Sequence, residues 1–144
     1  MYLLPWYRHN VFVRLYVCTV FSSFSTWQFQ LAVALVTLNR KESWDYPDNI
    51  ESVVIQGPTY TNWKGNVYPV KHKCQFSWYC DGKADVPEDS QTWNEVYQLA
   101  TFIMQYGMYD FTDGATHYHN DTVHPYWEDH LYHVVTIDNH IFYK

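Results

Sequence analysis

The feature that most constrains the fold is an almost unbroken apolar run at residues 28–40, QFQLAVALVTLNR. Its Leu and Ala residues favour a helix over a strand. The apolar residues do not keep to one stripe, as they would in a helix lying on a protein surface. We therefore predict a buried helix, which other parts of the chain must cover on several sides.

A second helix is predicted at residues 91–106. Its apolar residues recur with the i, i+3, i+4, i+7 spacing of one helical face. The chain has Asp89 or Ser90 to cap its start and Gly107 to end it. The residues on this face are Trp93, Val96, Tyr97, Ala100, Ile103 and Met104.

The other segments predict short elements. Asp48 and Glu51 have capping-box spacing and predict a helix at 49–56, which stops at Gly57-Pro58. Residues 59–87 show no helical period and predict a structured loop region with short strands. The β-rich runs 133–137 and 140–143 flank Asp138-Asn139 and predict a hairpin. The fold class is thus α+β, with helices first and a small antiparallel sheet last.

Length and charge limit the classes of protein that the chain can represent. The 144 residues suffice for one domain. The formal charge of −6 argues against nucleic acid as a partner. Residues 11–24 are apolar and fit either a strand or a buried helix, but Arg14 interrupts them. They are too short for a stable membrane span and form no clear signal peptide.

Aromatic content is the unusual part of the composition. It reaches 20%, with 14 Tyr and 7 Trp. Carbohydrates bind against aromatic faces, so the composition favours a sugar ligand; a Tyr-rich core and surface is the alternative. The stretch from Asp113 to Asn120 is dense in polar groups and combines a tyrosine with two histidines and an amide.

Two groups of residues leave more than one interpretation open. On a strand, His117 and His119 would share a face, as sugar-binding groups, as metal ligands or as a polar part of the core. Further histidines for a metal are His124, His130, His133 and His140. Cys74 and Cys80 allow a disulfide loop in an oxidising compartment or two free thiols elsewhere, and their spacing is not Cys-x-x-Cys.

Several segments, taken in order, resemble one family. They are Leu31-Ala32-Val33-Ala34 through Leu38-Asn39-Arg40, Tyr46-Pro47, Val54-Ile55-Gln56-Gly57, CQFSWYCDG at 74–82, Gly114-Ala115-Thr116-His117-Tyr118-His119, and Asn139-His140-Ile141-Phe142-Tyr143. Together they resemble the SleB/CwlJ-type cell wall hydrolases, particularly the short single-domain forms of phages and Gram-negative bacteria. The resemblance covers residues 30–144.

The resemblance implies a lysozyme-like α+β domain that cleaves peptidoglycan glycan strands as a lytic transglycosylase. It implies a monomer that needs no cofactor or metal and acts in the cell envelope, in the periplasm or outside the cell. Asn39-Arg40 is interpreted as a helix end, where Arg favours the helix dipole. The substrate-binding residues expected are Gln75, Trp78, His117, Tyr118, His119, Asn120, Tyr126, Trp127 and His140, with Cys74 and Cys80 holding one loop as a disulfide.

The catalytic acid of the family is missing. Family members carry Glu-Ala-Arg-Gly-Glu upstream of the Gln that precedes Ala-Val-Ala, and its first Glu is the general acid. Without a gap, this motif falls on Phe21-Ser22-Ser23-Phe24-Ser25, and no Asp or Glu precedes Glu42. Glycosidic cleavage needs a carboxyl group to protonate the leaving oxygen. No catalytic residue is therefore assigned, and Asp113 and Glu128, near the histidines, are interpreted as surface carboxylates.

Two hypotheses account for the missing motif. The chain is either a degenerate member that binds without cutting, or residues 1–29 are out-of-frame sequence joined to a family body at 30–144. All resemblance ends abruptly upstream of about residue 30, which motivates the second hypothesis.

Overall fold

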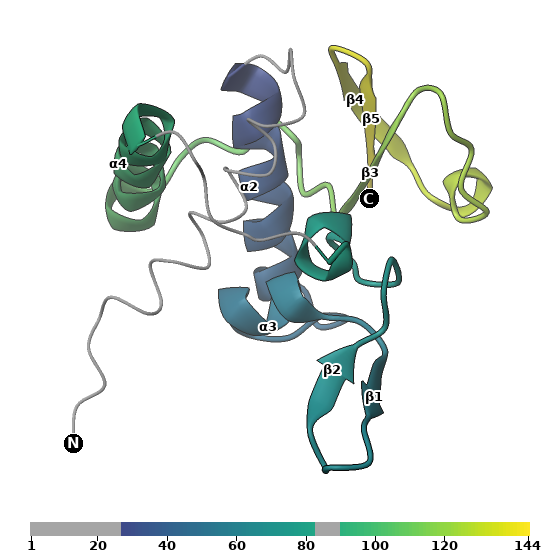
Figure 1. The fold of residues 1–144 in the computed structure, drawn as a ribbon. Helices are drawn as coiled ribbons and strands as arrows, with labels where there is room; N and C mark the ends of the chain where they lie inside the picture. The colour runs from purple at the N-terminus through teal and green to yellow at the C-terminus, as the bar shows by residue number, and fades with distance from the viewer. Residues whose placement is uncertain (1–26, 83–89) are drawn as a thin grey trace.

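The computed structural model describes residues 27–82 and 90–144. The described chain begins with helices α2 (Trp27–Glu42) and α3 (Ile50–Ile55) (Figure 1). A hairpin of β1 (Thr59–Thr61) and β2 (Val67–Pro69) follows, and then helix α4 (Ser90–Tyr106). A sheet of β3 (His117–Asn120), β4 (His133–Ile137) and β5 (His140–Tyr143) comes last. Two 3-10 helices, Ser77–Cys80 and Glu128–His130, lie in the connections. This order confirms the predicted α+β class. The expectations for residues 1–26, including 11–24, and for Asp89 fall outside the described residues.

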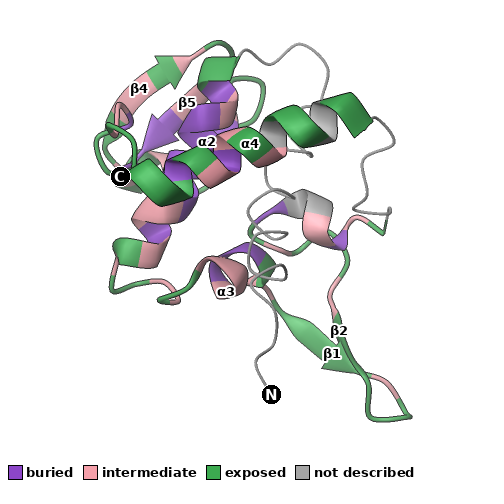
Figure 2. Ribbon diagram, turned by 90° about the vertical axis from the view of Figure 1, so that its left-hand side faces the viewer, coloured by how far each residue is buried: buried purple, intermediate pink, exposed green. Residues whose placement is uncertain are grey.

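Helix α2 forms the centre of the core, as its apolar sequence predicted. One side packs against α3, β5 and the loops, and the other packs against α4 (Figure 1). The burial colours of Figure 2 show the same central helix largely in purple. Its buried residues are Phe29, Leu31, Ala32, Val33, Ala34, Leu35, Val36, Thr37 and Arg40. A helix buried on both sides fixes the elements around it in relation to one another.

The start of α3 differs from the prediction. The N-cap is Asn49, whose Oδ1 accepts a hydrogen bond of 2.8 Å from the Ser52 backbone N–H. Asp48 lies one residue too early and instead accepts from the Asn49 amide. Both Asp and Asn are good N-caps, so sequence preference alone could not decide between neighbours. The predicted capping box of Asp48 and Glu51 is therefore wrong, although the helix exists.

We expect Asn49→Ala to lower the free energy of unfolding by about 1 kcal/mol, because the Ser52 N–H loses its acceptor. Chemical denaturation measures this change. Asp48→Ala is the matched control and should change stability by less than about 0.5 kcal/mol, as surface substitutions do. Equal losses in the two variants would mean that Asp48 shares the capping role.

Helix α4 largely follows its predicted stripe. Ala100 and Ile103 are buried against α2, and the helix ends where the Gly107 N–H donates to the Ile103 carbonyl at 2.9 Å, with φ of 74° at Gly107. Met104 was expected on the same stripe but is exposed. The buried α4 residues pack in a small cluster with Leu31 and Ala34 of α2, and residues at the edge of the stripe turn towards solvent. The side chains of Trp93 and Val96 lie outside the described part.

The two sheets are both antiparallel. β1 pairs with β2, with Tyr60 opposite Tyr68, and the larger sheet has the order β3-β5-β4. The turn between β4 and β5 has Asp138 at φ of 52°, which confirms the predicted closing hairpin. None of the helices between 27 and 82 or between 90 and 144 has both the length and the apolar character that crossing a membrane requires.

Candidate functional site

The alternation of side chains along β3 separates the predicted site residues into two groups. His117 and His119 point to the outer face, where the ring of Trp127 lies 5.0 Å and 5.5 Å from theirs. Tyr118 points to the opposite face, where its ring lies 5.5 Å from that of Phe142 in the core. We call the face of β3 that holds His117 and His119, together with Trp127, the His117 face; within it His119 is buried, with 6% of the residue exposed.

His117 is held between two hydroxyl groups. Its Nε2 lies 3.3 Å from the Tyr46 hydroxyl and its Nδ1 lies 2.9 Å from Thr116 Oγ1. Burial, together with the positive charge of Arg40, lowers the pKa of His117. The imidazole is therefore neutral at neutral pH and offers both a donor and an acceptor. Both ring nitrogens are used in these contacts, so His117 holds the Tyr46 and Thr116 hydroxyls in place, and these hydroxyls have further capacity for hydrogen bonds to sugar hydroxyls.

Arg40 supports this face from beneath and is only 4% exposed. Its Nε donates a 2.6 Å hydrogen bond to the Thr116 carbonyl, and its guanidinium lies 5.1 Å from the Tyr46 ring and 5.3 Å from the Phe76 ring. Burial lowers the pKa of Arg40, although the neighbouring tyrosines raise it in part. Among the described residues, no carboxylate forms an ion pair with it.

Arg40 lies in the last turn of α2, as predicted, but the helix continues to Glu42 and the Arg40 side chain is buried, which the interpretation as a helix-ending residue did not include. The sequence did contain a signal for this position. Val33, Val36 and Arg40 follow the i, i+3, i+7 spacing of one helical face. A charged residue on an otherwise buried face marks a position with a specific task.

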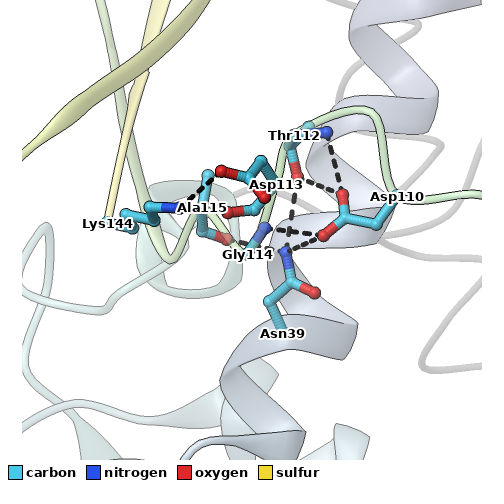
Figure 3. Close-up of polar contacts among 7 residues, drawn as sticks. All are labelled: Asn39, Asp110, Thr112, Asp113, Gly114, Ala115 and Lys144. Carbon is cyan, nitrogen blue, oxygen red and sulfur yellow. Dashed lines mark hydrogen bonds and ion pairs between the residues drawn. The ribbon is translucent and has the colours of Figure 1, made fainter.

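A network around Asp110 anchors the segment that leads into β3 (Figure 3). Asp110 Oδ1 accepts from the Thr112 backbone N–H at 2.9 Å and from its hydroxyl at 2.6 Å. Oδ2 accepts from the Gly114 N–H at 2.7 Å and from Asn39 Nδ2 at 3.0 Å. Asn39 Nδ2 also donates to the Ala115 carbonyl at 3.0 Å. The end of α2 is thereby tied to the residues just before His117.

These hydrogen bonds also set the charge of Asp110. Burial raises the pKa of this carboxyl, but the hydrogen bonds from Thr112, Gly114 and Asn39 outweigh burial, and the pKa is lowered in sum. Asp110 is therefore an ionised structural anchor. The sequence offered no pattern for this role, since Asn39 and Asp110 lie far apart along the chain.

Glu128 lies beside the His117 face but has the wrong properties for a general acid. The Tyr143 hydroxyl donates to its Oε1 at 3.0 Å, and His124 Nδ1 and His119 Nε2 lie 3.3 Å and 3.7 Å from its Oε2. Burial raises the pKa of Glu128, but the hydrogen bonds from Tyr143 and His124 and the charge of His119 lower it in sum. A general acid must be protonated at the working pH, so Glu128 fits an electrostatic role instead.

Removing the Tyr143 hydroxyl tests this account of Glu128. We expect Tyr143→Phe to raise the pKa of Glu128, because the strongest hydrogen bond to the ionised form is lost. NMR titration of the side-chain carboxyl measures the change. Because the pKa of Glu128 is lowered in the folded chain, its ionised form stabilises the fold above the ordinary glutamate pKa. This stabilisation is lost as the pH falls through the folded pKa. The variant has less of it to lose, so its stability should fall less in acid than that of the natural chain. Tyr132→Phe, at an exposed phenol, should leave the Glu128 pKa unchanged.

Asp113, the second carboxyl near the histidines, lies at the surface. Its side chain is 77% exposed and forms an ion pair with Lys144 (Figure 3). The Lys144 ammonium also donates to the Asp113 carbonyl at 3.1 Å. This arrangement fits the interpretation of Asp113 as a surface carboxylate.

The remaining expected residues near the sheet are not gathered on the His117 face. His140 is half-buried on the core side, where its ring stacks on Phe29 at 3.8 Å, and burial lowers its pKa. Asn120 Oδ1 accepts from the Thr122 backbone N–H and hydroxyl and so caps the turn after β3. Tyr126 is exposed next to Trp127. Their roles in binding stay predictions.

The loop at residues 74–80 contains the other expected residues. The structure joins Cys74 to Cys80 by a disulfide, with 6.1 Å between the Cα atoms. Gln75 is exposed, and its backbone N–H donates to the Gln56 carbonyl at 2.9 Å. The side chain of Trp78 lies outside the described part. Across the described ranges, no three His, Cys, Asp or Glu residues are grouped as a metal ion would require.

Comparisons with known proteins agree with this architecture. The crystal structure of the catalytic domain of the SleB protein from Bacillus cereus superposes with a TM-score of 0.62 and 22% identity, over 94% of this chain and 91% of that one. The likeness supports the predicted lysozyme-like fold. No curated protein matches the sequence significantly. A sequence profile described as cell wall hydrolase matches residues 26–143. Since the profile spans most of the sequence, this chain belongs to the SleB/CwlJ-type cell wall hydrolase family.

Proposed function

We propose that this chain binds the glycan strands of peptidoglycan on the His117 face and descends from enzymes that cleave them by lytic transglycosylation. The observation that carries the proposal is the grouping of His117, His119 and Trp127 beside Glu128 in a cell wall hydrolase domain. The neutral His117 imidazole, with the Tyr46 and Thr116 hydroxyls that it contacts, supplies donors and acceptors for sugar hydroxyls and acetamido groups. Trp127 supplies an aromatic ring for a sugar face.

The reaction requires one acid and no external water. The acid protonates the glycosidic oxygen while the bond from that oxygen to the anomeric carbon breaks. A hydroxyl of the same sugar then attacks the anomeric carbon and gives its proton to the base, which restores the acid. The ionised Glu128 fits a supporting role, because its negative charge favours the positive charge that develops on the sugar ring.

A second candidate function is a peptidoglycan-binding module without turnover. The carboxyl groups nearest to the His117 face favour it. Glu128 has a lowered pKa, and Asp113 is paired at the surface. The family's acid motif would fall on residues 21–25, which contain no Asp or Glu. The family match covers residues 26–143, so the domain that we propose at 30–144 lies almost entirely within it, and residues 1–25 of the proposed divergent segment lie outside it.

Turbidity and co-sedimentation on purified peptidoglycan separate the two functions. Clearing without added metal supports the enzyme, whereas co-sedimentation without clearing supports the binding module. Transglycosylation gives products that are one water lighter than those of hydrolysis and have no new reducing end, so mass spectrometry identifies the reaction. His117→Ala should weaken co-sedimentation. If the natural chain neither binds nor clears peptidoglycan, the proposed function is wrong.

The compartment and the oligomeric state follow as part of the same proposal. A cell wall hydrolase acts outside the cytoplasm, so we place the chain in the cell envelope, in the periplasm or outside the cell. A disulfide between Cys74 and Cys80 fits these oxidising compartments. The proposal requires one copy of the chain and no cofactor.

A further inference from the structure

The hairpin arm, residues 59–69, projects from the rest of the domain. Figures 1 and 2 show β1 and β2 extending away from α2, α3 and the larger sheet. All residues of β1 and the first two of β2 are exposed. An isolated two-stranded hairpin is only marginally stable in water, so contacts between the arm's own residues must contribute to its stability. Its aromatic residues are therefore of particular interest.

The tip of the arm is held rigidly by Asn62. The Asn62 side chain accepts hydrogen bonds from the backbone N–H groups of Lys64 and Asn66, each at 2.9 Å. The Asn62 carbonyl accepts from the Gly65 N–H at 3.0 Å, and Gly65 takes the left-handed conformation with φ of 84°. This turn places Trp63 in water, with 89% of the residue exposed. The fold gains little from an indole there.

A second aromatic surface lies along the strands. Tyr60 and Tyr68 are directly opposite each other across the hairpin, with ring centroids 5.8 Å apart and planes 28° apart. Both rings are about half exposed. At the tip, the Lys64 ammonium lies 4.8 Å from the Trp63 ring and covers part of one face. The arm thus offers fixed aromatic rings with a cation beside them.

The charge of this region is opposite to that of the whole chain. Residues 57–80 contain Lys64, Lys71 and Lys73 but no Asp or Glu, whereas the complete chain carries −6. Exposed aromatic rings beside ammonium groups are complementary to sugar rings that carry carboxylates. Peptidoglycan has this composition, because its sugars bear peptides that end in carboxylates. The acidic remainder of the chain disfavours a uniformly anionic polymer such as nucleic acid.

We propose that the hairpin arm is a second glycan-binding site, separate from the His117 face, which takes a peptidoglycan strand. Sugar rings stack on Trp63 and on the Tyr60–Tyr68 pair, and the lysines pair with the peptide carboxylates. The arm leads directly into the disulfide loop, whose Phe76 contacts Arg40 beneath the His117 face. The identity of the polymer rests on the proposed function.

Co-sedimentation of the full chain with purified insoluble peptidoglycan tests the arm. Trp63→Ala should weaken binding by about five- to tenfold, since one aromatic stacking contact is lost. Trp44→Ala is the matched control, because Trp44 is fully exposed in the connection between α2 and α3. It should bind as the natural chain does. Replacing Lys64, Lys71 and Lys73 with Gln should weaken binding at low salt and reduce its salt dependence.

The outcomes distinguish this proposal from the proposed function. If the natural chain binds peptidoglycan and Trp63→Ala binds equally well, the arm has no such role while the proposed function stands. If the natural chain does not bind peptidoglycan at all, the proposed function is wrong, and the proposal for the arm fails with it. Tighter binding of a single-stranded DNA oligonucleotide than of peptidoglycan, lost in Trp63→Ala, would assign the arm to nucleic acid and overturn the proposal.

Discussion

Replacing residues 21–25 with Glu-Ala-Arg-Gly-Glu is expected to raise the rate of peptidoglycan clearing at least about a hundredfold, because a positioned general acid contributes about 10²–10⁴. The natural sequence at these positions is Phe21-Ser22-Ser23-Phe24-Ser25, and Phe21 would receive the acid. The five positions lie outside the described residues, so the family motif alone gives the placement. Neither carboxyl beside the histidines fits this role in the natural chain, as Glu128 has a lowered pKa and Asp113 is paired at the surface.

The control for this experiment carries Gln-Ala-Arg-Gly-Glu. Its first side chain, Gln, has nearly the size of Glu but no carboxyl group that could donate a proton. It should bind peptidoglycan like the Glu variant but show no gain in clearing. If both variants clear equally, the acid lies elsewhere in the chain. The nucleotide sequence upstream of residue 30 provides a separate test. An alternative frame that encodes a Glu-x-Arg motif supports the out-of-frame hypothesis, and its absence from both alternative frames excludes it.

The second large effect is expected from Asp110→Ala, which should lower the free energy of unfolding by about 2–3 kcal/mol. The substitution removes the acceptor of hydrogen bonds from Thr112, Gly114 and Asn39. The segment before β3 then loses part of its attachment to α2, so peptidoglycan binding on the His117 face should weaken as well. Chemical denaturation and co-sedimentation measure the two effects.

The pH dependence of this loss has a definite sign. The pKa of Asp110 is lowered in the folded chain, so its contribution is complete above the ordinary aspartate pKa of about 4 and disappears as the pH falls through the folded value. The natural chain and Asp110→Ala should therefore converge in stability in strong acid. Asp113→Ala, which removes only a surface ion pair, should change stability by less than about 1 kcal/mol. A similar loss in both variants would contradict the anchoring role of Asp110.

The features that the sequence could predict are those set by local patterns. The continuous apolar run of α2 required burial on several sides, and the structure places it between α4 and the sheet. Gly107 takes positive φ and so ends α4, and Asp138 takes positive φ in the turn of the closing hairpin. In these cases, neighbouring residues carry the information.

The support of the candidate site could not be predicted in the same way. The Asp110 network joins residues that are distant in sequence and depends on how α2 packs. Arg40 resembled a helix-ending residue because a local rule explained it without reference to its buried stripe. Tyr46 approaches His117 from another loop, which no spacing indicates. Tertiary packing decided each of these positions.

The geometry of α2 also limits how related chains can differ. Phe29 near its start contacts His140, and Arg40 near its end bonds to Thr116. About three helical turns separate the two residues, so both point to the same side, where the sheet lies. Inserting one residue between them would rotate one relative to the other by about 100° and turn it away from its partner. We therefore expect related chains to keep the number of residues between Phe29 and Arg40. The hairpin arm is joined to the rest of the domain at its base only, so its length is free to vary.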